Sequence, residues 1–180
     1  MASEAWSALR EQIVSKAVVR GTVILSSGRE AEYYVDLRRV TLDGVAAPLV
    51  GRVMRELTED WEYSAVGGLT LGADPVATAM MHSAAADGEV LDSFVVRKEA
   101  KQHGLHRRIE GPDTSGRSVL AVEDTSTTGG SVLTAVDALL EEGASIVGVA
   151  VIVDRGAGPA IVERGLQYRA AYSLADLGLE

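Results

Sequence analysis

Two adjacent carboxylates, Glu123 and Asp124, follow the apolar run Val119 to Val122 and precede a loop rich in hydroxyl groups and glycine. The loop consists of Thr125, Ser126, Thr127, Thr128, Gly129 and Gly130, and leads to Ser131. Backbone N–H groups at the start of a helix bind phosphate, and glycines allow close approach of the ligand. Carboxylates repel phosphate but suit the cis-diol of a ribose or a magnesium ion. The segment therefore predicts a ligand with both a phosphate and a diol, such as a ribose 5-phosphate.

The same residues also fit an ordinary turn between a strand and a helix, in which Asp124 caps the helix. The order of the parts, with two acids before the hydroxyl and glycine residues, favours the phosphate-binding interpretation. Two common nucleotide-binding motifs, G-x-x-x-x-G-K-[ST] and G-x-G-x-x-G, do not occur in the sequence. Their absence disfavours an ATPase and a dehydrogenase.

A second group of candidate residues is basic. Between Arg97 and Arg108, the only acid is Glu99, and the cations and histidines include the candidates Arg97, Lys98, Lys101 and His103. Because the whole chain has a net charge of −9, a local basic cluster indicates an anion-binding site. The alternative is a solvated surface loop, which is what most charged runs are. The stretch 97–116 is long, polar and interrupted by glycines, and such loops are usually functional or mobile.

The elements that must position these residues alternate between strands and helices. Continuous apolar runs rich in Val or Ile predict strands buried on both faces, as in a parallel sheet. These runs are Ser93–Val96, Ser118–Val122 and Ile146–Val153. A helix is predicted over 131–142, and two short strands at 21–25 and 33–37 predict a small N-terminal hairpin. We therefore predict a single α/β domain over 1–180, with a central, mostly parallel sheet flanked by helices.

Composition excludes several classes of protein. The chain has 180 residues, enough for one domain with a sizeable core, and it lacks cysteine, which excludes disulfides and thiolate catalysis. The longest apolar run is too short to span a membrane, and the charges within Met1 to Ala17 leave no apolar core of a signal peptide. The acidic net charge disfavours general binding of nucleic acid. We expect a cytoplasmic protein that binds neither membranes nor nucleic acids.

Three segments resemble a known family. Val119 to Ser131 closely resembles the diphosphate–ribose signature of the type I phosphoribosyltransferases, with an apolar strand, two acids and a Thr-Thr-Gly-Gly turn. The run Arg97-Lys98-Glu99-Ala100-Lys101-Gln102-His103-Gly104 is similar to the mobile catalytic loop of one branch, the orotate phosphoribosyltransferases, and is the more specific marker for orotate. Residues 27–29 and 33–36 match that branch too. The resemblance covers about residues 20–155.

The resemblance implies a role for each candidate. Glu123 and Asp124 would bind the ribose hydroxyls, and the loop that follows would surround the 5-phosphate. Thr127 would also lie near the base. Arg155, directly after the last core strand, would bind the orotate carboxylate with its planar guanidinium, and we expect Asp154 to orient it. Phosphoribosyl diphosphate would also contact Arg97, Lys98, Lys101 and His103, of which the last three would be catalytic.

The resemblance also implies a reaction and partners. The phosphoribosyl group of phosphoribosyl diphosphate would pass to orotate, giving orotidine 5′-monophosphate and diphosphate in the biosynthesis of UMP. Mg2+ would be carried on the diphosphate, without a dedicated protein metal site. In the family, two subunits share their active sites, so we expect a homodimer in which the loop 97–116 folds over the partner's site. Residues 1–40 would form a small N-terminal hood.

Other functions remain open at this point. The chain could use another base, such as uracil or a purine, or it could be a regulatory protein of the same fold that senses phosphoribosyl diphosphate. Tyr33 and Tyr34 fit either stacking on a base or packing in the core. Many family members carry lysines near the positions of Ser26 and Gly72, and this chain has none there. The groups that replace these lysines are not identified by the sequence.

Overall fold

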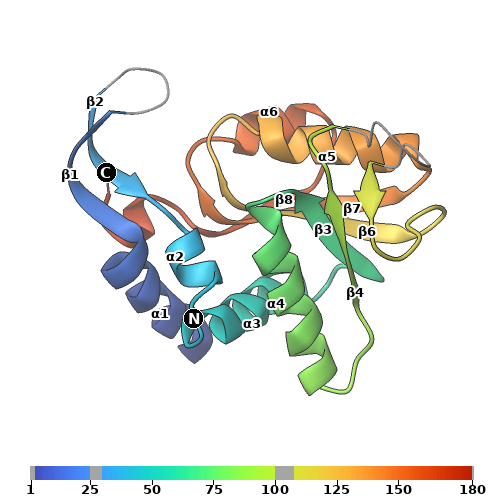
Figure 1. The fold of residues 1–180 in the computed structure, drawn as a ribbon, viewed down its shortest axis with the longest axis horizontal. Helices are drawn as coiled ribbons and strands as arrows, with labels where there is room; N and C mark the ends of the chain where they lie inside the picture. Colours follow the sequence, from blue (N-terminus) through green and yellow to red (C-terminus); the bar gives the residue numbers. More distant parts are fainter. Residues whose placement is uncertain (1–2, 25–29, 100–107, 180) are drawn as a thin grey trace.

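Figure 1 shows the fold in a computed structural model that describes residues 3–24, 30–99 and 108–179. Within these ranges, the central sheet has the strand order β5-β4-β3-β6-β7-β8. Neighbouring strands are parallel, except that β5 is antiparallel to β4. The strands are β3 (Ala65–Leu69), β4 (Asp92–Val96), β5 (Ile109–Glu110), β6 (Ser118–Ser126), β7 (Ser145–Asp154) and β8 (Tyr168–Tyr172). The predicted α/β class with a mostly parallel sheet is confirmed.

Helices cover both faces of the sheet (Figure 1). On one face lie α3 (Ala46–Leu57) and α4 (Ala73–Ala86), with α1 (Glu4–Gln12) packed on α3; on the other lie α5 (Gly130–Glu141) and α6 (Gly158–Glu163). Shorter turns are the π-helical Ile13–Ala17, α2 (Arg38–Thr41) and the 3-10 turn Ala175–Leu177. None of the helices in the described ranges combines the length and the apolar character that a membrane crossing needs.

The apolar runs of the sequence arise from this double coverage. Successive side chains of a strand point to opposite faces. In β6, Leu120 and Val122 face the cluster that includes α3 and α4, whereas Val119 and Ala121 face α5. All four are fully buried. A strand covered on both sides has no position for a polar residue in its centre, so its sequence is continuous rather than alternating.

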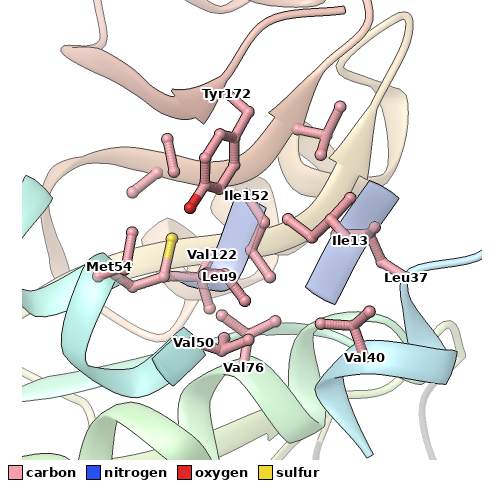
Figure 2. Close-up of a cluster of buried hydrophobic side chains, with 14 of the residues drawn as sticks. Leu9, Ile13, Leu37, Val40, Val50, Met54, Val76, Val122, Ile152 and Tyr172 are labelled. Atoms are coloured by element: carbon pink, nitrogen blue, oxygen red, sulfur yellow. The ribbon is translucent and has the colours of Figure 1, made fainter. Parts of the chain in front are cut away.

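The largest cluster of buried side chains joins the N-terminal helix to the sheet. Figure 2 shows the labelled members Leu9, Ile13, Leu37, Val40, Val50, Met54, Val76, Val122, Ile152 and Tyr172. Trp6 and Tyr172 fasten the two ends of the chain together: Trp6 Nε1 donates to Ala171 O at 2.8 Å, and the Tyr172 hydroxyl donates to Trp6 O at 2.7 Å. The N-terminal region is thereby fixed to the edge strand β8.

The predicted N-terminal hairpin is present as β1 (Val18–Ile24) and β2 (Glu30–Val35), which form a separate two-stranded antiparallel sheet (Figure 1). The strands begin earlier than predicted, and β2 ends at Val35 rather than at residue 37. It ends there because Asp36 accepts a hydrogen bond from the N–H of Arg38 at 3.3 Å, which turns the chain into α2. Ser26 lies outside the described residues.

Part of the stretch 97–116, for which we predicted a loop, is strand β5. Ile109 and Glu110 pair with Val96 and Val95 of β4, and the N–H of Arg97 donates to Arg108 O at 2.8 Å. The two ends of the predicted loop therefore lie beside each other at the edge of the sheet. The candidates Lys101 and His103 lie outside the described residues.

Candidate active site

The acid pair lies near the carboxyl end of β6, an interior strand that is third from the β8 edge of the sheet. Glu123 is only 5% exposed, and Asp124 is half-buried. Burial, followed by the charge of Asp124, raises the pKa of Glu123 to about 8, and burial also raises the pKa of Asp124. Asp124 Oδ1 accepts a hydrogen bond from the N–H of Thr125 at 2.6 Å. The pair is therefore poorly solvated, and hydroxyl donors or a cation from a ligand would stabilise its ionised form.

The loop between β3 and α4 approaches the acid pair closely. A Cβ atom on Gly72 would lie 2.5 Å from Glu123 Oε1 and 2.9 Å from Asp124 Oδ1, so a side chain at this position would displace the carboxylates. The acids open into a cavity of about 340 Å³. Its walls come from the hairpin, the β3–α4 loop, the basic stretch and the start of α5; the residues include Tyr34, Arg38, Thr70, Gly72, Lys98, Glu123, Asp124, Thr125 and Ser131.

The hydroxyl and glycine residues after the acids lead into α5, as predicted. Gly129 is the residue before the helix and has a φ of +80°, a conformation that favours glycine. No side chain at this position caps the helix, and the first N–H groups of a helix have no partner within it. Thr127 and Thr128 are exposed, and the Thr128 hydroxyl makes only a long 3.4 Å contact with the N–H of Gly130. This arrangement suits a phosphate group.

The neighbouring strand β7 brings Arg155 beside the loop. Ser126 pairs with Asp154 in the sheet, and the N–H of Arg155 donates to Ser126 O at 2.8 Å. Within the described residues, the buried Nε of Arg155 has no hydrogen-bond partner. We expected Asp154 to orient Arg155, but no hydrogen bond or ion pair joins the two side chains in the described part of the chain; Asp154 Oδ1 accepts instead from the N–H groups of Gly156 and Ala157, at 2.8 and 2.9 Å, in the turn before α6.

The basic stretch reaches the acid pair through Lys98, which lines the same cavity. Arg97 is half-exposed, and its Nη1 lies 3.7 Å from Glu110 Oε1. The structure thus brings Lys98, Glu123, Asp124, Thr125 and Ser131 to one cavity, and it places Arg97 at the entry to the stretch rather than at the acids.

Proteins of known family are similar to this chain over almost its whole length. The profile of the phosphoribosyl transferase domain family matches residues 40–164. The orotate phosphoribosyltransferase of Corynebacterium glutamicum is 59% identical to this chain, and the match covers 98% of this chain and 96% of that relative. This chain belongs to the orotate phosphoribosyltransferase family. The predicted family is therefore confirmed.

Two further members of the family are similar to this chain. The orotate phosphoribosyltransferase of Streptomyces avermitilis is 69% identical over 118 residues, which are 66% of this chain and 65% of that relative. The crystal structure of the Mycobacterium tuberculosis enzyme in complex with 5-phospho-α-D-ribosyl 1-diphosphate has a TM-score of 0.86 and 55% identity, and covers 97% of this chain and 99% of its own. The type I phosphoribosyltransferase fold is confirmed by these matches.

Some residues of the cavity were not singled out by sequence reasoning. Arg38 lines it from α2, and its Nε donates to Asp36 Oδ1 at 2.8 Å. No local pattern around Arg38 indicates a site, because only the path of the hairpin brings it to β6. The two tyrosines differ: Tyr34 lines the cavity, whereas Tyr33 packs against the largest core cluster.

Proposed function

We propose that this protein transfers the phosphoribosyl group of phosphoribosyl diphosphate to orotate, forming orotidine 5′-monophosphate and releasing diphosphate. The observation that carries the proposal is the buried acid pair of β6 directly before an uncapped helix start. Carboxylates that accept hydrogen bonds from a diol, followed by N–H groups that bind a phosphate, match a ribose 5-phosphate in both chemistry and order. Membership of the orotate phosphoribosyltransferase family supports the same substrate.

In this proposal, Glu123 and Asp124 accept hydrogen bonds from the ribose hydroxyls and fix the sugar ring. The hydroxyl and N–H groups at the start of α5 hold the 5-phosphate; they belong to Thr125, Ser126, Thr127, Thr128, Gly129, Gly130 and Ser131. Holding the ribose at both ends fixes the anomeric carbon between the leaving diphosphate and the incoming base. Such positioning accounts for a large part of catalysis in displacement reactions.

The base binds on the other side of the loop, next to Thr127 and Arg155. The buried Nε of Arg155, which has no hydrogen-bond partner within the described residues, supports this role, because a buried donor without a partner is costly unless a ligand pairs with it. A guanidinium can bind both oxygens of the orotate carboxylate. The orotate nitrogen then attacks the anomeric carbon with inversion, as the bond to diphosphate breaks.

The basic stretch stabilises the departing diphosphate. Lys98 lies at the cavity of the acid pair, and we propose that Arg97, Lys101 and His103 join it when the stretch closes over the substrate. Cations placed where negative charge accumulates lower the energy of the transition state. Closure would also exclude water, which would otherwise hydrolyse the reactive sugar.

Mg2+ is the cofactor that we propose for this site. The residues present fit a hard cation, because the carboxylate oxygens of Glu123 and Asp124 face the cavity in which the diphosphate would lie. When bound with the substrate, the ion supplies charge neutralisation to the leaving diphosphate. Glu123 and Asp124 would hold the ribose, and the ion would be carried on the diphosphate of the substrate.

We propose that the protein acts as a homodimer in the cytoplasm. Leu42, Val45 and Leu71 are 70%, 67% and 60% exposed, and Leu42 and Leu71 line a groove of about 970 Å³ beside α3 and α4. A second copy would cover this apolar surface. Leu71 directly precedes Gly72, so a subunit bound there would lie next to the active site. Sedimentation of the wild type should give a dimer, and Leu42→Asp should give monomers.

Orotate consumption tests the proposed function. Purified protein is mixed with Mg2+, phosphoribosyl diphosphate and orotate, and the loss of orotate absorbance is followed, with uracil, hypoxanthine and adenine as parallel substrates. We expect turnover of orotate alone, with release of diphosphate. Turnover of another base would contradict the role of Arg155. Binding of phosphoribosyl diphosphate without turnover of any base would favour a regulatory protein.

A further inference from the structure

The cavity at the acid pair has an unusual distribution of charge. Among the described residues that line it, Asp36, Glu123 and Asp124 are acidic, whereas the cations are Arg38 and Lys98. A diphosphate carries several negative charges, and the acids would repel it unless cations on the walls offset them. Lys98 belongs to the basic stretch. The part of the wall that the hairpin and α2 form has Arg38 as its cation.

Arg38 is held in place by its own neighbours. Asp36 Oδ1 accepts hydrogen bonds from both the backbone N–H and the Nε of Arg38, at 3.3 and 2.8 Å. Leu37 and Val40, on either side in sequence, are buried in the core cluster and anchor α2 (Figure 2). Because Asp36 uses only the Nε side of the guanidinium, the two Nη groups make no hydrogen bond within the described part of the chain. They remain as donors for a ligand.

The position of Arg38 indicates which part of the substrate it meets. The cavity contains the acid pair, the β3–α4 loop and Lys98, but Thr127 and Arg155, the residues proposed for the base, are not among its lining residues. The charge of Arg38 also acts on the acid pair, since it lowers the pKa of Asp124 against the larger effect of burial. An anionic group that enters between Arg38, Lys98 and the acid pair would be attached to the ribose on the side away from the base.

We propose that Arg38, on the part of the cavity wall that the hairpin and α2 form, binds the diphosphate of phosphoribosyl diphosphate. This inference rests on the proposed function, because it takes the substrate from there. The guanidinium donates its Nη hydrogens to diphosphate oxygens, while Asp36 keeps it oriented. Arg38 is then a substrate-binding residue of the hairpin wall, and Asp36 is a positioning residue that acts through it.

Arg39 offers a matched control for the test. It is the next residue of α2, has the same charge, is exposed, and does not line the cavity. Binding of inorganic diphosphate with Mg2+ is measured by calorimetry for the wild type, Arg38→Gln, Arg38→Lys and Arg39→Gln. Hydrogen bonds between charged groups contribute about 1.5–3 kcal/mol, so Arg38→Gln should weaken diphosphate binding roughly 10- to 100-fold. Arg39→Gln should bind like the wild type, and Arg38→Lys should recover part of the loss.

The KM values and the Arg39 control distinguish diphosphate binding by Arg38 from binding of the base and from a general effect of charge. Arg38→Gln should raise the KM for phosphoribosyl diphosphate and leave the KM for orotate within about twofold. Unchanged diphosphate binding in Arg38→Gln overturns the inference, and so does an equal loss in Arg39→Gln, which would indicate a general effect of charge. A rise in the KM for orotate alone would place Arg38 at the base. Since diphosphate binding is measured without a base, failure of the orotate assay in the wild type would contradict the proposed function without deciding this inference.

Discussion

Two neighbouring strand–loop–helix units have the same layout and different chemistry. The β6 unit runs from β6 to α5, and the β7 unit runs from β7 to α6. β6 and β7 are parallel, pair over most of their length, and each leads through a glycine-containing loop into a helix, α5 or α6. At the end of β7, Asp154 Oδ1 accepts hydrogen bonds from the N–H groups of Gly156 and Ala157, in the turn that precedes α6. At the end of β6, neither acid accepts a hydrogen bond from a described N–H group at the start of α5, and Asp124 Oδ1 accepts one from the N–H of Thr125 instead.

The two units differ in the groups that their acids bind. The first N–H groups of any helix need partners, and a capping carboxylate supplies them at no cost to the fold. In the β6 unit, Glu123 and Asp124 precede α5 by a few residues, and their carboxylates lie in the cavity, where burial raises their pKa values. Carboxylates and helix N–H groups that do not pair with each other suit a ligand that binds both.

The largest expected effect comes from removing the charges of the β6 acids. We expect the double variant Glu123→Gln, Asp124→Asn to lose roughly 100-fold or more in kcat/KM, because two charge-assisted hydrogen bonds to the ribose become weaker. The change from acid to amide in Asp154→Asn is the matched control in the β7 unit, and it should leave kcat/KM within about twofold. Equal losses in the two variants would remove the distinction between the units.

Gly129→Ala tests whether the backbone conformation at the start of α5 is needed to bind phosphate. Gly129→Ala places a Cβ on a residue with a φ of +80°, 3.4 Å from Ile161 Cγ1, and should distort the open helix start. We expect a loss of about 1 kcal/mol in the free energy of unfolding and a roughly tenfold weaker affinity for inorganic phosphate. Gly165 has a φ of +74°, and a Cβ there would meet no atom within 4 Å. Gly165→Ala should therefore lower stability similarly, and calorimetry should show unchanged phosphate binding.

The raised pKa values of the β6 acids predict a pH dependence of stability. The pKa of Glu123 rises from 4.5 to about 8 on folding, so between these values the folded state binds more protons than the unfolded chain. The free energy of unfolding should therefore fall as pH rises from 4.5 to about 8, by at most about 1.4 kcal/mol per pH unit for one group. Glu123→Gln should flatten this slope in urea titrations, whereas Asp154→Asn should keep it. A slope that the Glu123 variant does not change would contradict the burial of an ionisable pair.

The smallest effect concerns the β7 unit. Asp154→Ala removes the acceptor for the turn residues Gly156 and Ala157 and should lower the free energy of unfolding by about 1 kcal/mol, as for other lost hydrogen bonds. Turnover at a temperature well below the unfolding transition should stay near that of the wild type. A large loss of turnover in a folded variant would show that Asp154 acts on Arg155 after all.

The β6 unit was predictable from the sequence because all of its parts lie within Val119 to Ser131. The order of apolar strand, acids, hydroxyls and glycines lies within one short segment, so it can be recognised without knowledge of contacts to distant residues. The strand itself was predicted too short: it runs to Ser126, with the acids inside it. Their burial depends on the approach of Gly72 from another loop, which no local pattern indicates.

Features that depend on distant contacts were missed or misread. Asp154 looked like a partner for Arg155, because its hydrogen bond to Gly156 depends on the conformation of the turn that follows it. Arg38 reaches the cavity only through the path of the hairpin. No strand was predicted at Tyr168–Tyr172, because β8 is an edge strand, where half-buried positions do not require a continuous apolar run. The order of residues within Val119 to Ser131 thus predicts the central segment of the proposed site. The residues that form its walls depend on contacts between segments far apart in the sequence.

The most direct test is the affinity of the protein for phosphoribosyl diphosphate, measured after changes to the acids of either unit. Calorimetric titration with Mg2+ and phosphoribosyl diphosphate is carried out on the wild type, the Glu123→Gln, Asp124→Asn double variant and Asp154→Ala, each folded at the temperature used. We predict that the double variant binds roughly 100-fold more weakly, and that Asp154→Ala binds like the wild type. Wild-type affinity in the double variant would contradict the assignment of the β6 unit as the substrate site.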